Sequence, residues 1–432
     1  MSKAVPEVDF ASAEILQCPF HAYRELRDEA PVWRDPSNGS FQITRYEDIR
    51  AIVLDPETYP NGAGATSPVE MLKGIEDPTP EVKAMLDLEL EIQDMYERDG
   101  WVPTTSLLGR DGDEHRGLRR LFDDFLKPAK IAQWRDHVQA VVDERIDGFI
   151  DKGTCDWSVE FSSLLPGYVM APMIGVPRED IPMVKQWTVA WIERLGMMQA
   201  PEARLDSVRQ EIEAQQYFHR LIEDARAHPD DELLISYLVN SEVPGWGRKL
   251  TENEIMSELM IDVFVGGAET TTHALNSGMW LLTGDPEAQR QLAADPAGNA
   301  GAFVEEILRL ESPTQGTMRT VAKDVELHGV HIPAGSVLML RISSANRDER
   351  RYDDPDDIKL DRKNPRTHMT FTTGKHHCVG APLARQELQV TFETVARRMK
   401  DITFTEGKND FLMVRNYFMR GLQELHIDFT AR

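Results

Sequence analysis

Apolar residues recur at helical spacing along most of this chain, whereas alternating apolar and polar runs are short and few. The helical spacing predicts helices at residues 20–30, 46–54, 81–97, 115–127, 251–283 and 383–399, and through much of 130–250. The strand-like runs are residues 32–34, 41–44, 321–330, 337–341 and 415–425. The pattern therefore predicts a mainly α fold with a small β region.

The run at residues 251–283 predicts the most informative helix. Thr251 and Glu254 have the spacing of a capping box, and no proline interrupts the run, so a helix of roughly 50 Å is expected. Gly266 and Gly267 lie in its middle, where each glycine costs about 1 kcal/mol relative to alanine. A small-residue helix crossing, close approach of a flat ligand, or local opening of the helix for water each explains this cost.

A second unusual stretch, F-T-T-G-K-H-H-C-V-G, occupies residues 371–380. Pro382 follows at once and suits a first helical turn, so Cys378 is expected just before a helix N-terminus. The free amides and the macrodipole at that position favour an anionic thiolate, which is a metal ligand or a nucleophile. Gly374 and Gly380 allow tight turns and close approach of a bulky group.

Three interpretations of Cys378 follow from the residues alone. It is a buried structural cysteine, a ligand of zinc together with His376 and His377, or the thiolate ligand of a haem iron. Adjacent ligands rarely reach one tetrahedral ion, and neither Cys18 nor Cys155 supplies a second C-x-x-C pair. These observations disfavour zinc.

The pattern F-x-x-G-x-H-x-C-x-G, continued by A-P-L-A-R at residues 381–385, resembles the haem-binding loop of the cytochrome P450 family. The resemblance implies the cytochrome P450 fold as a single domain, residues 20–432, after an N-terminal extension, residues 1–19. It implies that Cys378 ligates the iron of haem b. The other loop residues that it assigns to cofactor binding are Phe371, Gly374, His376 and Gly380.

Further motifs extend the resemblance. G-G-A-E-T-T at residues 266–271 is similar to the oxygen-binding motif of the family, with Glu in place of the commoner Asp. By this resemblance Glu269 and Thr270 are the catalytic acid–alcohol pair that delivers protons to the oxygen, and Gly266 contacts the cofactor. His115 and Arg119, one helical turn apart, together with Arg319, match residues that bind the haem propionates.

The resemblance also assigns structural and pocket residues. Glu306 and Arg309 match the E-x-x-R pair of the family, and Arg362 is their expected third partner; all three are expected to be structural. The expected substrate pocket consists of Tyr96, Trp101, Val265, Thr314, Thr317, Met318 and Phe418.

Composition limits the partners. With 73 acidic against 48 basic residues the net charge is −25, which argues against nucleic acid and anionic membranes as partners. Three cysteines suit a reducing cytoplasm, and we find neither a signal peptide nor an apolar membrane span. No flavin or nicotinamide fingerprint is present, so a separate ferredoxin or flavodoxin is the expected electron donor. An exposed basic patch of Arg116, Arg120, Lys127, Lys375 and Arg385 is expected to attract it, and the chain is expected to be a monomer.

The resulting hypothesis is a haem-thiolate monooxygenase that activates O2 and inserts one oxygen atom into a mostly apolar small molecule. Terpenoid, steroid, fatty and aromatic compounds all fit the expected pocket. Two alternatives keep the same cofactor: a peroxide-driven peroxygenase and a non-catalytic haem-binding sensor. A cysteine hydrolase or a zinc protein is the alternative without haem.

Overall fold

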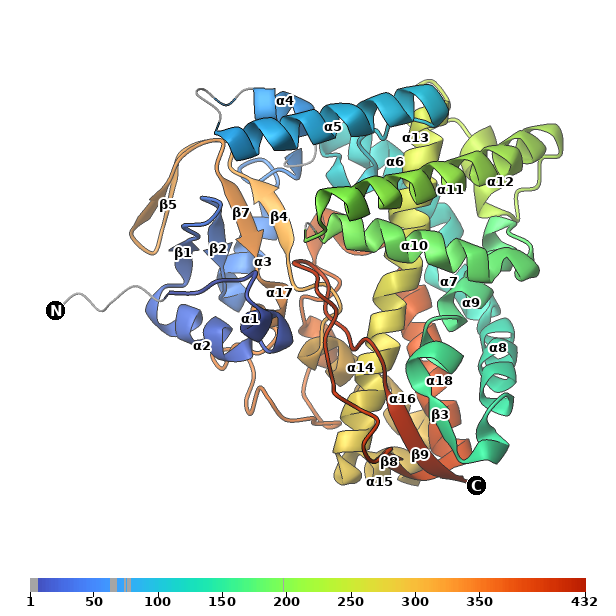
Figure 1. Cartoon of the computed structure of the whole chain (residues 1–432). Helices are drawn as coiled ribbons and strands as arrows, with labels where there is room; N and C mark the ends of the chain where they lie inside the picture. The colour runs from blue at the N-terminus through green and yellow to red at the C-terminus, as the bar shows by residue number, and fades with distance from the viewer. Residues whose placement is uncertain (1–6, 63–67, 74, 76–78, 197) are drawn as a thin grey trace. The chain divides into compact units, whose positions relative to one another are not determined.

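The computed structural model describes residues 7–62, 68–73, 75, 79–196 and 198–432 (Figure 1). The described chain is mainly helical with small sheets, which confirms the predicted fold class. It divides into two compact units, and each is described by itself: unit 1 comprises Met1–Tyr59, Leu126–Val169 and Gly267–Arg432, and unit 2 comprises Pro60–Phe125 and Met170–Gly266. No helix among the described residues is long and apolar enough to cross a membrane.

Unit 1 is built around α18, which packs against α16, α8 and α14. Gly278 on α14 permits this packing, because a Cβ there would lie 2.7 Å from Ile307 Cδ1 and would also overlap the Phe392 ring. Its α-helices are α1 (Ala13–Gln17), α2 (Phe20–Glu29), α3 (Tyr46–Leu54), α7 (Pro128–Gln133), α8 (Arg135–Asp147), α14 (Thr270–Gly284), α15 (Pro286–Ala294), α16 (Pro296–Leu310), α17 (Ile342–Ala345) and α18 (Ala381–Arg398). Helix α9 (Leu165–Ile174) begins in unit 1 and ends in unit 2.

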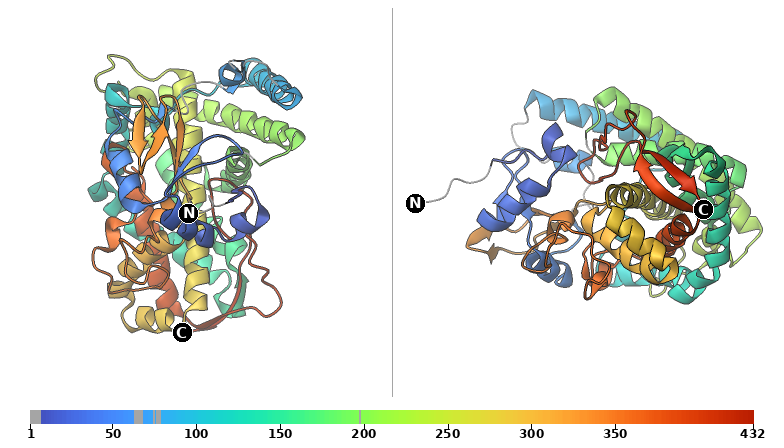
Figure 2. Two further views of the ribbon diagram at one scale, coloured as in Figure 1. Left: turned by 90° about the vertical axis from the view of Figure 1, so that its left-hand side faces the viewer. Right: turned by 90° about the horizontal axis from the view of Figure 1, so that it is seen from below.

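The sheets of unit 1 are small, as predicted (Figure 2). Among the described residues there are three: β1-β2-β7-β4, β3-β9-β8 and β5-β6. The strands are β1 (Val32–Arg34), β2 (Phe41–Ile43), β3 (Thr154–Asp156), β4 (Thr317–Thr320), β5 (Val325–Leu327), β6 (Val330–Ile332), β7 (Val337–Leu340), β8 (Met399–Phe404) and β9 (His426–Ala431). The hairpin of β1 and β2 and the strand β7 lie where the alternation of residues predicts them.

Two strand predictions are wrong. Residues 321–330 do not form one strand, because His328 and Gly329 both have positive φ and turn the chain between β5 and β6. Residues 415–425 form isolated bridges rather than strands. There the side chain of Asn416 accepts hydrogen bonds from the amides of Phe418 and Met419, both at 2.9 Å, which favours a turn.

Unit 2 is helical in its described residues. Its helices are α4 (Pro68–Lys73), α5 (Pro80–Asp99), α6 (Gly112–Leu126), α10 (Ile181–Leu195), α11 (Pro201–Ala227), α12 (Leu234–Asn240) and α13 (Glu252–Ser257). Helix α11 packs against α10, α12 and α5, and α10 lies alongside α11 (Figure 1). Ile92 and Tyr96 of α5 and Val208 and Ile212 of α11 belong to one buried apolar cluster.

The long helix predicted at residues 251–283 is helical throughout, but it is not one α-helix. Thr251 and Glu254 form the predicted capping box, in which the Thr251 amide donates to Glu254 Oε2 at 2.8 Å. After α13 the chain follows a π-helix, η6 (Glu258–Glu269), before α14 begins at Thr270. The Thr271 hydroxyl donates to the Gly267 carbonyl at 3.1 Å and so competes with the α-helical hydrogen bond at that position. Wide turns of this kind are frequent at functional sites.

Candidate functional site

Cys378 lies in unit 1 between a short 3₁₀ turn, η8 (Gly374–His376), and the first turn of α18. The Phe371 carbonyl anchors the loop: it accepts a hydrogen bond from the Cys378 amide at 3.0 Å, and His377 Nδ1 lies 2.9 Å from it. Gly380 is the N-cap of α18 and Pro382 follows in the first turn, as predicted. The side chain of Cys378 is exposed, so the loop presents the sulfur at the surface of unit 1 beside a helix N-terminus.

The two glycines of the loop differ in what the protein requires of them. Gly374 has φ +75°, and a Cβ there would lie 3.1 Å from Leu54 Cδ2 of α3, so its own neighbours demand glycine. Gly380 has φ −78°, and a Cβ there would meet only the Cys378 sulfur, at 3.9 Å. Nothing in the protein's own packing explains Gly380, whereas a broad group bound to Cys378 does.

Glu269 and Thr270 stand where the π-helix gives way to α14. Glu269 is buried and Thr270 is half-buried. Two residues after Thr270, the Thr272 hydroxyl donates to the Ser162 carbonyl at 3.1 Å. Gly266 lies one turn earlier and is exposed, although its neighbours in the helical segment are buried or half-buried. The nearest atom to a Cβ at Gly266 would be the Ile261 carbonyl oxygen, 3.4 Å away.

The residues assigned to the propionates fall in both units. In unit 2, His115 is buried on α6, and Arg119, one turn later, donates to Asp123 Oδ1 at 2.7 Å. In unit 1, Arg319 is buried on β4 and donates to the Met318 carbonyl at 2.7 Å, while His376 is half-buried in η8. The sequence analysis did not foresee Asp123, which holds the Arg119 side chain in one direction.

The expected pocket residues are also divided between the units. In unit 2, Tyr96 and Val265 are buried, and Trp101 is held by Gln215, whose side chain hydrogen-bonds both its amide and its carbonyl at 2.9 Å. In unit 1, the four remaining candidates are half-buried: Thr314, Thr317, Met318 and Phe418. They lie close in the fold, because the Gln315 amide donates to the Phe418 carbonyl at 2.7 Å.

Glu306, Arg309 and Arg362 meet in unit 1. The carboxylate of Glu306 accepts from Arg309 at 2.8 and 2.9 Å and from Arg362 Nε at 2.9 Å. The two guanidinium groups also donate to backbone carbonyls of Asn346, Asp353, Asp354, Pro355 and Asp357. The three side chains therefore fix the irregular segment that precedes the Cys378 loop.

The neighbouring carboxylate, Glu305, forms a cluster that the sequence analysis missed. Arg385 Nε donates to Glu305 Oε1 at 2.8 Å, and His368 Nε2 lies 2.9 Å from Glu305 Oε2. Burial raises the pKa of Glu305, but His368 and Arg385 outweigh it and hold the pKa at about 2. The sequence predicts Arg385 in an exposed basic patch, and this prediction is wrong, because the side chain is largely buried against Glu305 and the Phe371 ring.

Three further buried carboxyls were not foreseen. Glu258 and Asp262 lie one turn apart on η6, and Glu258 accepts from the Leu107 amide at 3.0 Å. Burial and mutual repulsion raise the pKa of Glu258, and burial raises that of Asp262. In unit 1, burial raises the pKa of Glu387 on α18 to about 8. All three are acidic residues within apolar helical runs, which is the feature that could have identified them. The sequence does not show whether such residues are buried.

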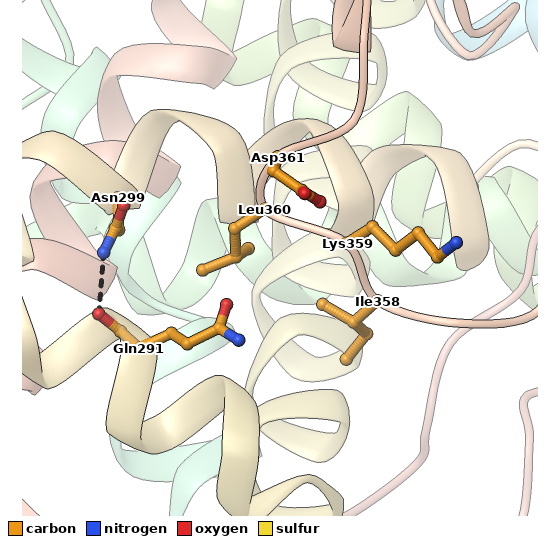
Figure 3. A pocket seen from close by; sticks show the side chains of 6 residues that line it. All are labelled: Gln291, Asn299, Ile358, Lys359, Leu360 and Asp361. Atoms are coloured by element: carbon orange, nitrogen blue, oxygen red, sulfur yellow. Dashed lines mark hydrogen bonds between the residues drawn. The ribbon is translucent and has the colours of Figure 1, made fainter.

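A surface pocket of about 400 Å³ in unit 1 includes none of the residues discussed so far (Figure 3). One of its lining residues, Lys359, contacts the cluster described above, because its backbone amide donates to the Glu306 carboxylate at 3.0 Å. The pocket is lined by Gln291, Asn299, Ile358, Lys359, Leu360 and Asp361. Its six lining residues include no cysteine or histidine that could ligate a haem iron, so it does not compete with the Cys378 loop as the candidate site.

Comparison with known proteins agrees with this geometry. The family model described as cytochrome P450 matches residues 300–409, which include the Glu306–Arg309 pair and the Cys378 loop. A steroid C26-monooxygenase of Mycolicibacterium smegmatis is 31% identical over 410 residues, covering 95% of this chain and 92% of the relative. The chain belongs to the cytochrome P450 family.

Solved structures give the same result. Cytochrome P450 CYP109Q5 from Chondromyces apiculatus is 30% identical with a TM-score of 0.79, and the match covers 98% of each chain. P450BioI, solved with a hexadec-9Z-enoic acid-ligated acyl carrier protein, is 28% identical with a TM-score of 0.81, covering 97% of this chain and all of that one. The protein is a cytochrome P450 monooxygenase, an oxidoreductase of a family that uses a haem-thiolate cofactor, O2 and electrons from a redox partner.

Proposed function

We propose that this monooxygenase binds haem b through Cys378 and inserts one oxygen atom into an uncharged, mostly apolar small molecule. One observation carries the proposal: a loop tied at both ends presents the exposed Cys378 sulfur beside the N-terminus of α18. The helix macrodipole and the free amides there stabilise a thiolate, which is the soft ligand that haem iron accepts. When bound, the haem supplies the activation of O2 and the oxygen transfer.

The protein's own groups orient the reactants and move protons. Gly266 leaves space beside the helix where a side chain would intrude, and Thr270 offers a hydroxyl one turn later. The buried carboxyl of Glu269 adjoins Thr270 in sequence and is the proposed source of its protons. Glu269 is 2% exposed, so we propose that the protons that it passes to Thr270 are replaced from solvent by a route through the protein.

Four residues are proposed to bind the propionates of the haem: His115, Arg119, Arg319 and His376. Arg119 and Arg319 supply charge-assisted hydrogen bonds, which are the strongest contacts available to a carboxylate. The hydrogen bond from Arg119 to Asp123 and that from Arg319 to the Met318 carbonyl orient these guanidinium groups in advance. We propose that the two histidines donate further hydrogen bonds.

The proposed substrate class is steroid- or acyl-sized and electrically neutral at the reacting end. Two relatives support the size, because one is named a steroid monooxygenase and another was solved with a sixteen-carbon acyl chain on its carrier protein. The proposed walls Val265, Met318 and Phe418 are apolar. None of the seven proposed pocket residues is basic, so a free carboxylate on the substrate would lose its hydration without gaining a charged partner.

We further propose that a separate ferredoxin or flavodoxin delivers the electrons to a monomeric enzyme in the cytoplasm. Three cysteines in 432 residues support a reducing compartment. Arg385 does not belong to the exposed basic patch. Of the other predicted members, Arg120, Lys127 and Lys375 are exposed, and Arg116 is ion-paired with Asp113 at 2.9 Å. An acidic partner that docks there is expected to bind more weakly as the ionic strength rises.

Turnover with defined electron donors tests the proposal. The purified holoenzyme is incubated with a candidate substrate and either NAD(P)H with a ferredoxin and its reductase, or hydrogen peroxide alone, under ¹⁸O2. Incorporation of one labelled oxygen atom only with the ferredoxin system supports the proposal. Product with peroxide alone indicates a peroxygenase, and no product with either donor across substrates that shift the haem spectrum indicates a binding protein.

The substrate class is tested separately with a fatty acid, its methyl ester and a neutral sterol. We expect the ester and the sterol to bind at least about tenfold more tightly than the acid, as measured by spectral titration. Equal affinity of the acid and the ester in the parent enzyme contradicts the proposed exclusion of carboxylates.

A further inference from the structure

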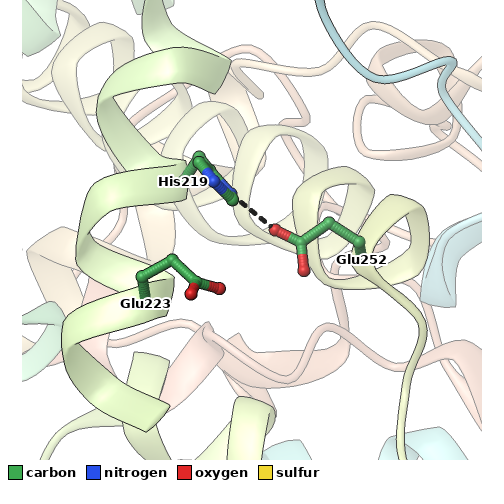
Figure 4. Close-up of side chains that lie close together, drawn as sticks. All are labelled: His219, Glu223 and Glu252. Carbon is green, nitrogen blue, oxygen red and sulfur yellow. Dashed lines mark hydrogen bonds and ion pairs between the residues drawn. The ribbon is translucent and has the colours of Figure 1, made fainter. Parts of the chain in front are cut away.

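A cluster of three potential metal ligands lies in unit 2, apart from the residues assigned to catalysis (Figure 4). His219 and Glu223 are one turn apart on α11, and Glu252 is the first residue of α13. One ligand atom from each residue lies within 4.8 Å of the other two. His219 Nδ1 lies 2.8 Å from Glu252 Oε1, and Figure 4 shows all three side chains directed toward one another.

Two of these side chains are held in place by their surroundings. The ring of His219 packs on Trp101, with ring centroids 4.8 Å apart, and Gln215 fixes the Trp101 backbone one turn earlier on α11. Glu252 follows the capping box of Thr251, which fixes the start of α13. Glu223 is exposed, so its carboxylate has the freedom to close on an ion. Pre-oriented ligands lower the entropic cost of binding.

The cluster already holds one positive charge. Arg226 contacts both carboxylates, donating to Glu223 and, at 2.5 Å, to Glu252 Oε2. The arrangement is therefore built to hold a cation between two helices.

We propose that His219, Glu223 and Glu252 bind a divalent transition ion of the zinc class, which displaces Arg226 from the two carboxylates. One imidazole and two carboxylates are donors that zinc accepts, and water completes the coordination. The imidazole disfavours calcium and magnesium, which prefer oxygen ligands. Two carboxylates neutralise a divalent ion, whereas Arg226 then adds an unbalanced positive charge. Arg226 is therefore a built-in competitor that keeps the affinity moderate.

An ion bound in this way would link α11, α13 and the segment that carries Trp101. The proposal does not depend on the oxidation chemistry, so its failure would leave the proposed monooxygenase function intact. Binding is also expected to stabilise the fold, because the three ligands come from elements that separate on unfolding.

Isothermal titration of the holoenzyme with ZnCl2 provides the test. We expect one ion per chain, and about tenfold or greater loss of affinity in His219→Gln and in Glu223→Gln. Arg226→Gln should bind zinc about tenfold more tightly than the parent, because the competitor is gone. His228→Gln is the matched control, since His228 pairs with Asp224 on the same helix and lies outside the cluster.

A second readout uses Trp101 as a reporter. Cu²⁺, which binds imidazole more tightly than zinc does, should quench part of the tryptophan emission, and Trp101→Phe should remove that part. Absence of stoichiometric zinc binding, or equal affinity in the parent, Glu223→Gln and Arg226→Gln, overturns the proposal. If His219→Gln fails to fold, Glu223→Gln alone provides the test. The side chain of Glu223 is exposed, so its substitution should not disturb folding.

Discussion

The guanidinium carbon of Arg385 lies 4.5 Å from the centre of the Phe371 ring, at the start of the loop that presents Cys378. The other side of the guanidinium is bound to the buried carboxylate of Glu305. Arg385 therefore connects α16, through Glu305, with the aromatic residue whose carbonyl anchors the Cys378 amide. A residue that the sequence places on the surface is part of the support of the candidate site.

Arg385→Ala should destabilise the protein by about 2–4 kcal/mol, because it removes one partner of a buried ion pair and leaves Glu305 under-compensated. Urea unfolding measures this loss. Arg366→Ala is the matched control: Arg366 lies 3.3 Å from the same carboxylate, but 71% of its side chain is exposed. It should cost less than about 1 kcal/mol. Equal losses in the two variants would mean that burial of Arg385 is unimportant.

Cys378→Ala should abolish the reduced, CO-bound Soret band at the position typical of thiolate ligation. The reason is that the variant has no anionic sulfur at the N-terminus of α18. Difference spectra of the purified protein provide the measurement. Cys18→Ala, which changes another exposed cysteine, should leave the band in place. Survival of the band in Cys378→Ala refutes the assignment of the ligand.

Thr270→Ala should uncouple electron consumption from product formation, with release of peroxide, because the proposed hydroxyl donor is lost. The ratio of product to NAD(P)H consumed measures the coupling, and we expect it to fall several-fold. Thr271→Ala is the neighbouring control, since the Thr271 hydroxyl is committed to the Gly267 carbonyl. A variant at Thr270 that couples as well as the parent removes this residue from the mechanism.

Glu387→Gln should make stability less dependent on pH. Burial raises the pKa of Glu387 to about 8, so the folded protein retains a proton that the unfolded chain releases above its ordinary carboxyl pKa. The free energy of unfolding of the parent should therefore fall as the pH rises from about 4.5 to 8, by roughly 5 kcal/mol from this group, and level off above that.

The glutamine variant should lack this decline and be the more stable protein at pH 8.5. Urea unfolding at pH 5 and at pH 8.5 measures the difference. Glu393→Gln, on the same helix but ion-paired with Arg135 at 2.8 Å, should keep the decline. Identical pH profiles for the parent and Glu387→Gln would show that this carboxyl is not buried in its neutral form.

Local signals in the sequence identified much of the fold. The capping box of Thr251 and Glu254 and the strands predicted at residues 32–34 and 41–44 each depend on residues a few positions apart, and both are confirmed. The turn at His328 and Gly329 was missed, although both residues adopt the positive φ that this kind of hairpin requires. That error came from reading β-branched residues on both sides as one strand.

Interactions between distant residues were beyond such reasoning. Glu305 and Arg385 are 80 positions apart, and nothing in either neighbourhood indicates the pairing. The apolar residues of the π-helix at residues 258–269 also fit the spacing of an α-helix. The sequence pattern therefore does not distinguish the two kinds of helix. The Cys378 loop was found because the five specified residues of its motif all occur within ten positions.

Glu306, Arg309 and Arg362 order the irregular segment before the Cys378 loop, which is not paired with a strand. Five carbonyls that a strand would satisfy with amides are satisfied here by two guanidinium groups. A strand depends on the register of its neighbours, but this anchor depends on three side chains alone. Insertions and deletions in the chain on either side of this anchor should therefore leave its geometry unchanged.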